Sequence, residues 1–277
     1  MSNELINLCN VSKTFGKRNV LNNINLSINK GQSIGLIGHN GSGKSTFLKM
    51  VSGLTNIDTG KITYRNPLKF NYVPEHFPKM DITAKQYIEH MGLIDGLRYE
   101  FIQEESHNLF ERFFMEDMIN TPMKHLSKGT LQKVGVVQAL ITKPDVLLLD
   151  EPLSGQDIDS QNVFIELIHR LNLHGVTIIM SCHEKFLLAR LSKTIYEIKN
   201  GSLETRELHN FSLCKYDILH FLNSNKDNFI DSHIESLVHK IDFNDNKIEM
   251  LVETEKSNEV IKKMLDNGYI LRGMYNE

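Results

Sequence analysis

A glycine-rich stretch near the N-terminus has the residue types that bind a triphosphate. Residues 38–46 read Gly-His-Asn-Gly-Ser-Gly-Lys-Ser-Thr, which matches the pattern G-x-x-x-x-G-K-[ST]. Glycines let backbone N–H groups converge on phosphate oxygens without Cβ clashes, and a following helix N-terminus adds its dipole. Lys44 would supply a cation to the β- and γ-phosphates, and the Ser45 hydroxyl would bind Mg²⁺. The residues expected at this nucleotide site are Gly38, Asn40, Gly41, Ser42, Gly43, Lys44, Ser45 and Thr46.

The sequence around this loop favours a real site over a chance match. In a chain of this length the pattern occurs by accident roughly once in a hundred. Here an apolar run at 34–37 precedes the loop, and apolar residues at helical spacing follow it (Phe47, Leu48, Val51). This is the strand–loop–helix setting that the pattern requires.

Two adjacent carboxylates supply the second candidate for chemistry. The run 146–149 is entirely apolar and indicates a strand buried in a parallel sheet, and Asp150 and Glu151 follow it directly. Adjacent acids at the tip of a buried strand are costly without a cation or a shared proton. Asp150 can reach Mg²⁺ through water, and Glu151 can face an attacking water.

Three further side chains stand where ligands or bases could gather. His183 follows the next strand, 176–180, and Glu75 follows a strand that must end before Pro74. Ligands collect at the carboxyl ends of parallel strands, although a lone histidine is more often a structural residue. Phe15 lies near a turn upstream of the loop, where packing is its ordinary role and stacking on a purine is the alternative.

These residues need a sheet with parallel strands to position them. Residues 4–30 alternate apolar and polar as antiparallel strands, whereas 80–135 show helical spacing only and predict a helical insertion. We predict an α/β P-loop core with a mixed sheet, an antiparallel β subdomain and this insertion, spanning 1–205. Residues 206–277 predict a small α+β accessory domain without a catalytic constellation, with strands near 216–222, 237–243, 247–253 and 269–274 and a helix at 257–265.

Composition limits the possible partners. The formal net charge is −3, aromatic residues make up 8% of the 277 residues, and Trp is absent, so no nucleic-acid partner is expected. Cys9, Cys182 and Cys214 have no metal-ligand spacing and suit a reducing cytosol. The chain shows neither a signal peptide nor an apolar run of about 20 residues. Action at a membrane would therefore require a partner chain.

The order of the motifs resembles the nucleotide-binding subunit of ATP-binding-cassette (ABC) transporters over about residues 3–205. The motifs are Phe15, the loop 38–46, residues 72–75, the stretch Leu126-Ser127-Lys128-Gly129-Thr130, residues 147–152, Ser154-Gly155-Gln156-Asp157 and His183. The resemblance implies that Phe15 stacks on adenine, Glu151 is the catalytic base and His183 contacts the γ-phosphate. It also implies that Ser127, Lys128 and Gly129 act in trans on the γ-phosphate held by a second subunit.

Three positions depart from the common family pattern. The signature reads L-S-K-G-T where L-S-G-G-Q is commonest, Glu75 replaces the usual Gln, and Gln156 replaces the usual Leu. The Pro-Glu pair and the L-S-K-G signature resemble an exporter branch whose permease is a separate chain. That branch often carries a C-terminal α+β appendage.

The resemblance implies a complete set of ligands and partners. ATP and Mg²⁺ would be the cofactors, with Ser45, Glu75 and Asp150 on the metal side. The partners would be an integral-membrane permease and a second ABC subunit, identical or different, at the cytoplasmic face of the cell membrane. The sequence leaves two alternatives open: a soluble ABC ATPase in nucleic-acid repair or protein assembly, and a regulatory or immunity cassette with low turnover, which Glu75 motivates.

Overall fold

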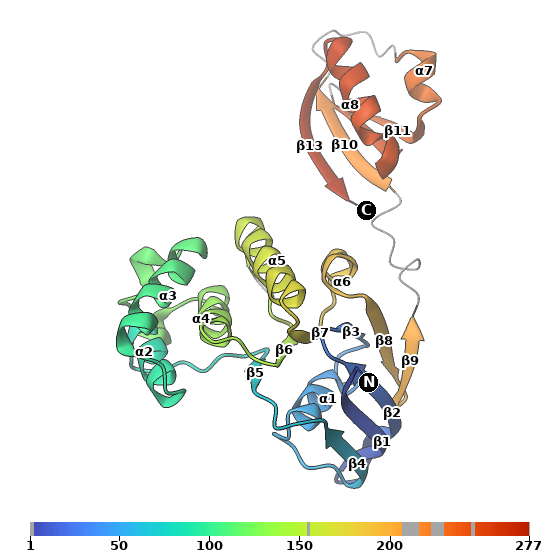
Figure 1. Cartoon of the computed structure of the whole chain (residues 1–277). Helices are drawn as coiled ribbons and strands as arrows, with labels where there is room; N and C mark the ends of the chain where they lie inside the picture. The colour runs from blue at the N-terminus through green and yellow to red at the C-terminus, as the bar shows by residue number, and fades with distance from the viewer. Residues whose placement is uncertain (1–2, 154–155, 207–215, 223–229, 245–246, 277) are drawn as a thin grey trace. The chain divides into compact units, whose positions relative to one another are not determined.

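A six-stranded sheet carries the elements that position the predicted site (Figure 1). Its strand order is β5-β6-β7-β3-β8-β9, and every pair is parallel except the antiparallel hairpin of β8 and β9. Every residue of β6 and β7 is buried, as the apolar runs predict. The strands are β3 (Ser33–Ile37), β5 (Phe70–Val73), β6 (Val146–Asp150), β7 (Thr177–Ser181), β8 (Thr194–Lys199) and β9 (Ser202–Arg206).

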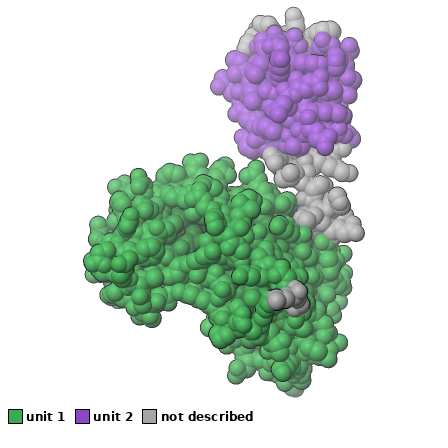
Figure 2. All heavy atoms as spheres, viewed as in Figure 1, with its two compact units in different colours: residues 1–210 green, residues 211–277 purple. Residues whose placement is uncertain are grey.

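The computed structural model describes residues 3–153, 156–206, 216–222, 230–244 and 247–276. The chain forms two compact units, residues 1–210 and 211–277, which are coloured separately in Figure 2. The sequence places its domain boundary between residues 205 and 206. Of the residues named from the sequence, Ser154, Gly155 and Cys214 lie outside the described residues.

A separate antiparallel sheet of order β2-β1-β4 forms the predicted β subdomain. It consists of β1 (Glu4–Phe15), β2 (Arg18–Asn29) and β4 (Thr59–Tyr64). Its alternating apolar side chains share one core with helix α1 (Lys44–Val51), where Phe47 and Leu48 are fully buried. The helix that follows the glycine-rich loop is thus held by packing on this sheet, and not only by its own hydrogen bonds.

The segment between β5 and β6 is helical, as its periodicity predicts. It contains α2 (Ala84–Ile94), α3 (Tyr99–Arg112), α4 (Lys128–Leu140) and two 3₁₀ turns, η1 (Glu116–Met118) and η2 (Met123–His125). The helical spacing of the apolar residues at 101–119 predicts one helix over that range. This is wrong: α3 ends at Arg112, because Phe114 adopts the left-handed backbone at φ 56°. Ser127 caps α4, accepting a hydrogen bond from the Thr130 N–H, so the helix begins at Lys128.

The second unit has a βαββαβ arrangement. Its antiparallel sheet has the order β11-β12-β10-β13, and its helices share a core with one face of the sheet. The four-residue α7 was not predicted from the sequence. The elements are β10 (Tyr216–Leu222), α7 (Ser232–Glu235), β11 (Val238–Asn244), β12 (Lys247–Glu253), η4 (Thr254–Lys256), α8 (Ser257–Asp266) and β13 (Ile270–Asn276).

Two more helices, α5 (Ile158–Leu173) and α6 (Lys185–Leu191), follow β6 and β7. Among all the helices that the structure describes, none is both long and apolar enough to cross a lipid bilayer.

Asp157 gives the fold a pH-dependent contribution to stability. Its carboxylate caps α5 by accepting from the Ser160 N–H at 2.8 Å, and it accepts from Lys133 Nζ of α4 at 3.0 Å. The Ser160 bond, followed by Lys133, lowers the pKa of Asp157 below its usual 3.8. The unfolded chain then binds the proton more tightly, so the stabilisation is full above about pH 5, declines as the pH falls below the unfolded-state pKa of 3.8, and is gone only below the lowered pKa of the folded state.

We expect Asp157→Asn to keep the cap and lose the charge. At pH 7 the unfolding free energy should fall by about 1 kcal/mol, a modest value because the side chain is half exposed. Urea unfolding at pH 7 and at pH 3.5 should show that this difference shrinks in acid. The exposed Asp159→Asn in the same helical turn is the control; an equal, pH-independent loss in both variants would contradict the assignment.

Candidate functional site

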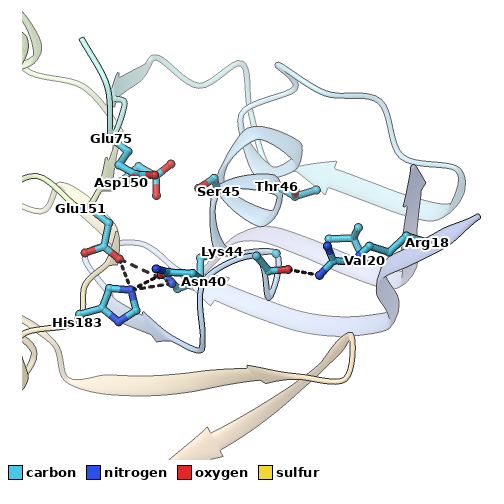
Figure 3. A pocket seen from close by; sticks show the side chains of 12 residues that line it. Arg18, Val20, Asn40, Lys44, Ser45, Thr46, Glu75, Asp150, Glu151 and His183 are labelled. Carbon is cyan, nitrogen blue, oxygen red and sulfur yellow. Dashed lines mark hydrogen bonds and ion pairs between the residues drawn. The ribbon is translucent and has the colours of Figure 1, made fainter. Parts of the chain in front are cut away.

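A cavity of about 640 Å³ opens at the carboxyl edge of the parallel strands. We call it the edge cavity. The loop after β3 and the ends of β5, β6 and β7 contribute to it, since the carboxyl ends of parallel strands meet at one edge (Figure 3). Its lining residues are Arg18, Val20, Asn40, Gly41, Gly43, Lys44, Ser45, Thr46, Glu75, Asp150, Glu151 and His183.

The glycine-rich loop wraps closely between β3 and α1. Gly43, directly before α1, has φ 114°, and a Cβ there would lie 2.9 Å from the Val20 side chain of β2. Both the backbone conformation and the close approach therefore require glycine. Lys44 bends back over the loop and donates from Nζ to the Gly38 carbonyl at 2.9 Å. The loop is thus closed by its own lysine.

A cation, an imidazole and a carboxylate converge beside this loop. His183 Nε2 lies 3.2 Å from Lys44 Nζ and 3.2 Å from Glu151 Oε1. Lys44 Nζ and Glu151 Oε1 are 3.7 Å apart, and both side chains are largely buried. Burial raises the pKa of the Glu151 carboxyl, while the charges of His183 and Lys44 oppose the rise. A carboxyl group whose pKa is raised by burial is suited to accept a proton from water.

The backbone aims Glu151 into the cavity. Its φ of 48° lies in the left-handed region, which costs a non-glycine residue about 1 kcal/mol. Ser181 of β7 holds this conformation, because the Glu151 N–H donates to both the Ser181 carbonyl and the Ser181 hydroxyl, each at 3.1 Å. Strain that neighbouring strands maintain is typical of functional positions.

Oxygen atoms suited to a hard cation lie on the other side of the cavity. Asp150 is buried and accepts from the Tyr72 hydroxyl at 3.0 Å and from the Ser181 hydroxyl at 2.6 Å. Glu75 is half exposed, beside His76, and Ser45 opens α1 opposite these carboxylates (Figure 3). Two carboxylates and a hydroxyl around one space fit Mg²⁺, which prefers oxygen ligands.

The structure does not bring every sequence-predicted residue to this cavity. Within the described residues, its lining excludes two predicted loop residues, Gly38 and Ser42, as well as Phe15 and the stretch Ser127, Lys128 and Gly129. Phe15 is exposed at the end of β1, with Lys13 Nζ 5.2 Å from its ring centroid. The Ser127 stretch begins α4 and lies exposed or half-buried.

The structure also adds residues that the sequence did not single out. Arg18 and Val20 of β2 line the cavity, and Arg18 donates from Nη2 to the Gly41 carbonyl at 2.7 Å. Only their position just after the turn of the β1–β2 hairpin could have suggested them. Tyr72 and Ser181 hold Asp150, but their place depends on strand order, which no sequence motif encodes.

One group of potential metal ligands includes Glu151 itself. Within the described residues, ligand atoms of Glu151, Cys182 and Glu184 lie within 4.8 Å of one another. Burial raises the pKa of the Cys182 thiol, which donates to Glu184 Oε2 at 3.0 Å. A protonated thiol is a poor metal ligand, so this group is better described as a hydrogen-bonded pair next to Glu151.

Comparison with known proteins gives consistent relatives. A family model described as "ABC transporter" matches residues 21–154. The zinc import ATP-binding protein ZnuC of Pseudomonas fluorescens is 34% identical over 192 residues, covering 68% of this chain and 71% of that protein. The ABC transporter ATP-binding protein NatA of Bacillus subtilis is 32% identical over 217 residues, covering 72% and 87%.

Solved structures agree with the sequence relatives. An ATP-binding subunit of an ABC transporter superposes with a TM-score of 0.68 at 25% identity, covering 74% of this chain and 91% of that one. A dimeric bacterial ABC transporter cassette superposes with a TM-score of 0.67 at 26% identity, covering 74% and 99%.

The contact between Arg18 and the glycine-rich loop leads to a binding prediction. We expect Arg18→Ala to weaken ATP binding about fivefold, because a charge-assisted hydrogen bond on an exposed carbonyl contributes about 1 kcal/mol. Fluorescence titration with a labelled ATP measures the change. The adjacent, exposed Lys17→Ala removes the same charge without this contact and should change affinity less than twofold. Equal losses in both variants would assign the effect to net charge alone.

Proposed function

The chain belongs to the ABC transporter family as an ATP-binding and ATP-hydrolysing subunit, and we propose that it powers export through a separate permease chain. The observation that carries the proposed catalytic role is the convergence of Lys44, Glu151 and His183 on one side of the edge cavity. Membership of a transporter family favours this function over a soluble clamp or a regulatory cassette.

We assign a role to each group that lines the cavity. The backbone N–H groups of the loop and Lys44 bind the β- and γ-phosphates. Glu151 orients the attacking water and accepts its proton, while Lys44 and His183 stabilise the negative charge on the phosphoryl group during its transfer. Ser45, Asp150 and Glu75 are the residues that would hold Mg²⁺, which neutralises phosphate charge when bound.

The signature stretch supports a head-to-tail dimer. Ser127, Lys128 and Gly129 stand at the N-terminus of the 13-residue α4, where unpaired N–H groups and the helix dipole favour an anion. They do not line the edge cavity of their own chain. In the proposed dimer, each α4 would face the γ-phosphate held by the other chain, with Phe15 stacking on adenine in its own. A dimeric structural neighbour supports the formation of a dimer.

The helical segment offers a surface for the permease. Four large apolar side chains are exposed where α2 ends and α3 begins: Leu93, Ile94, Tyr99 and Phe101. Ile94 is 77% exposed. Grouped exposed apolar side chains are typical of protein contact sites. We propose that this surface holds the chain peripherally at the cytoplasmic face of the membrane.

We propose export as the direction, on the Pro74-Glu75 pair and the Leu126-Ser127-Lys128-Gly129 signature. The relatives named for zinc import support the opposite direction. Inside-out vesicles that contain the chain and its permease distinguish the two. ATP-dependent uptake of the transported compound supports export, and ATP-dependent release of it contradicts export.

The role of Glu151 predicts a separation of binding from turnover. Glu151→Gln keeps the shape of the side chain but removes the base, so kcat should fall at least about a hundredfold. ATP affinity should change less than threefold. The matched control is Glu184→Gln, which changes an exposed carboxylate two residues after Cys182. This variant should retain most of the activity. ATPase assays and labelled-ATP titrations provide both readouts, and wild-type turnover in Glu151→Gln would overturn the assignment.

The proposed permease surface predicts a loss of membrane association. We expect Ile94→Glu to move the chain from the membrane fraction to the soluble fraction of cells that express its permease, because burying an unpaired charge in a contact is costly. Leu173→Glu, at the end of α5, changes a side chain of similar exposure, 73%, outside this surface. It should leave the distribution unchanged. Retention of Ile94→Glu on membranes would exclude this surface as the contact.

A further inference from the structure

Two hydroxyls from neighbouring strands donate hydrogen bonds to the buried carboxylate of Asp150. In the sheet, β6 lies between β5 and β7. Tyr72 of β5 donates to Oδ2 at 3.0 Å, and Ser181 of β7, the register partner of Asp150, donates to Oδ1 at 2.6 Å. Only 2% of Asp150 is exposed. A buried carboxylate needs fixed hydrogen-bond partners, and these two hydroxyls supply one to each of its oxygens.

The two bonds fix the orientation of the carboxylate. An ionised carboxylate only accepts, and each of its oxygens has two lone-pair sites. One donor on each oxygen sets the plane of the group and leaves acceptor capacity on both oxygens. A phenol is protonated at neutral pH, so the Tyr72 hydroxyl is the donor in its bond to Asp150. The remaining lone pairs can accept from, or bind, a ligand in the cavity that Asp150 lines.

Tyr72 and Ser181 differ in what else they hold. Ser181 also accepts from the Glu151 N–H, so it supports both the metal-side carboxylate and the proposed base. The Tyr72 hydroxyl bonds Asp150 alone among the described residues. Two residues further along the chain from Tyr72, the Pro74 carbonyl accepts from Gln132 Nε2 of α4 at 2.8 Å. The strand that carries Tyr72 is therefore anchored to the signature helix.

We propose that Tyr72 is a positioning residue for the metal side of the site, which aims Asp150 so that bound Mg²⁺ strengthens ATP binding. This inference rests on the proposed function, in which Asp150 serves Mg²⁺. Tyr72 acts through Asp150 and does not itself contact the nucleotide. Its loss should therefore weaken the metal dependence of binding, and leave metal-free binding and the base intact.

The test compares ATP affinity with and without Mg²⁺. A labelled ATP is titrated in EDTA and in Mg²⁺, and the ratio of the two dissociation constants measures how strongly the metal enhances binding. We expect Tyr72→Phe to lower this ratio about tenfold, the effect of one hydrogen bond to a charged group. Affinity in EDTA should stay within twofold. The Mg²⁺ concentration for half-maximal ATPase rate should rise in parallel.

Two further variants separate positioning from folding. Tyr64→Phe removes a more exposed phenol, which donates to the Val51 carbonyl at 2.9 Å, and should leave the ratio unchanged. Ser181→Ala should lower the ratio and also reduce kcat at saturating Mg²⁺, because it releases the Glu151 backbone. An equal fall of the ratio in Tyr64→Phe, or a fall of EDTA affinity that accounts for the whole effect in Tyr72→Phe, would overturn the inference.

Asp150→Asn distinguishes this inference from the function on which it rests. If Asp150→Asn removes the Mg²⁺ enhancement while Tyr72→Phe retains it, the positioning role of Tyr72 is wrong and the metal role of Asp150 stands. If Asp150→Asn also retains the enhancement, the proposed metal role itself fails. Loss of the enhancement in both variants supports Tyr72 as the positioning residue.

Discussion

Charge buried at the edge of a parallel sheet is the constraint on which the rest of this chain depends. Asp150, Glu151 and Lys44 are all largely withdrawn from water, and a buried charge is tolerated only with fixed partners. Lys44 donates to a carbonyl of its own loop, whereas Asp150 accepts from hydroxyls of β5 and β7, strands that lie far from it in sequence. The strand order that satisfies these charges is the same order that builds the site.

The helix α4 connects this edge to the helical segment through two consecutive residues. Gln132 donates to the Pro74 carbonyl after β5, and Lys133 donates to both the Phe113 carbonyl and Asp157. The helix that starts with the signature stretch is thereby attached to the strand end before Glu75 and to the start of α5. If the helical segment moves, either these hydrogen bonds are strained or the strand end and the start of α5 move with it, since packed elements transmit movement. Coupling between a partner surface and the catalytic edge has a physical route here.

Much of the fold and the residues of the edge cavity could be predicted from the sequence, because their signals are local. The glycine pattern fixes the loop, and the apolar run 146–149 fixes a buried strand that ends in Asp150 and Glu151. Tyr72, Ser181 and Arg18 could not be found this way, since their roles depend on which strands are neighbours. The end of α3 was predicted wrongly for another reason. Phe113 and Phe114 continue the apolar periodicity, but the backbone of Phe114 is not helical.

The position of β3 in the sheet has a consequence for how the chain is made. Its neighbours are β7 and β8, and the first of them begins about 140 residues after β3 ends. A ribosome adding about 5–20 residues per second needs about 7–30 s to supply that partner. During this interval the apolar β3 and its glycine-rich loop exist without the strands that will flank them. The most specific stretch of the sequence is therefore synthesised long before the strands that flank it, and until then only the packing of its helix on the antiparallel β subdomain can hold it.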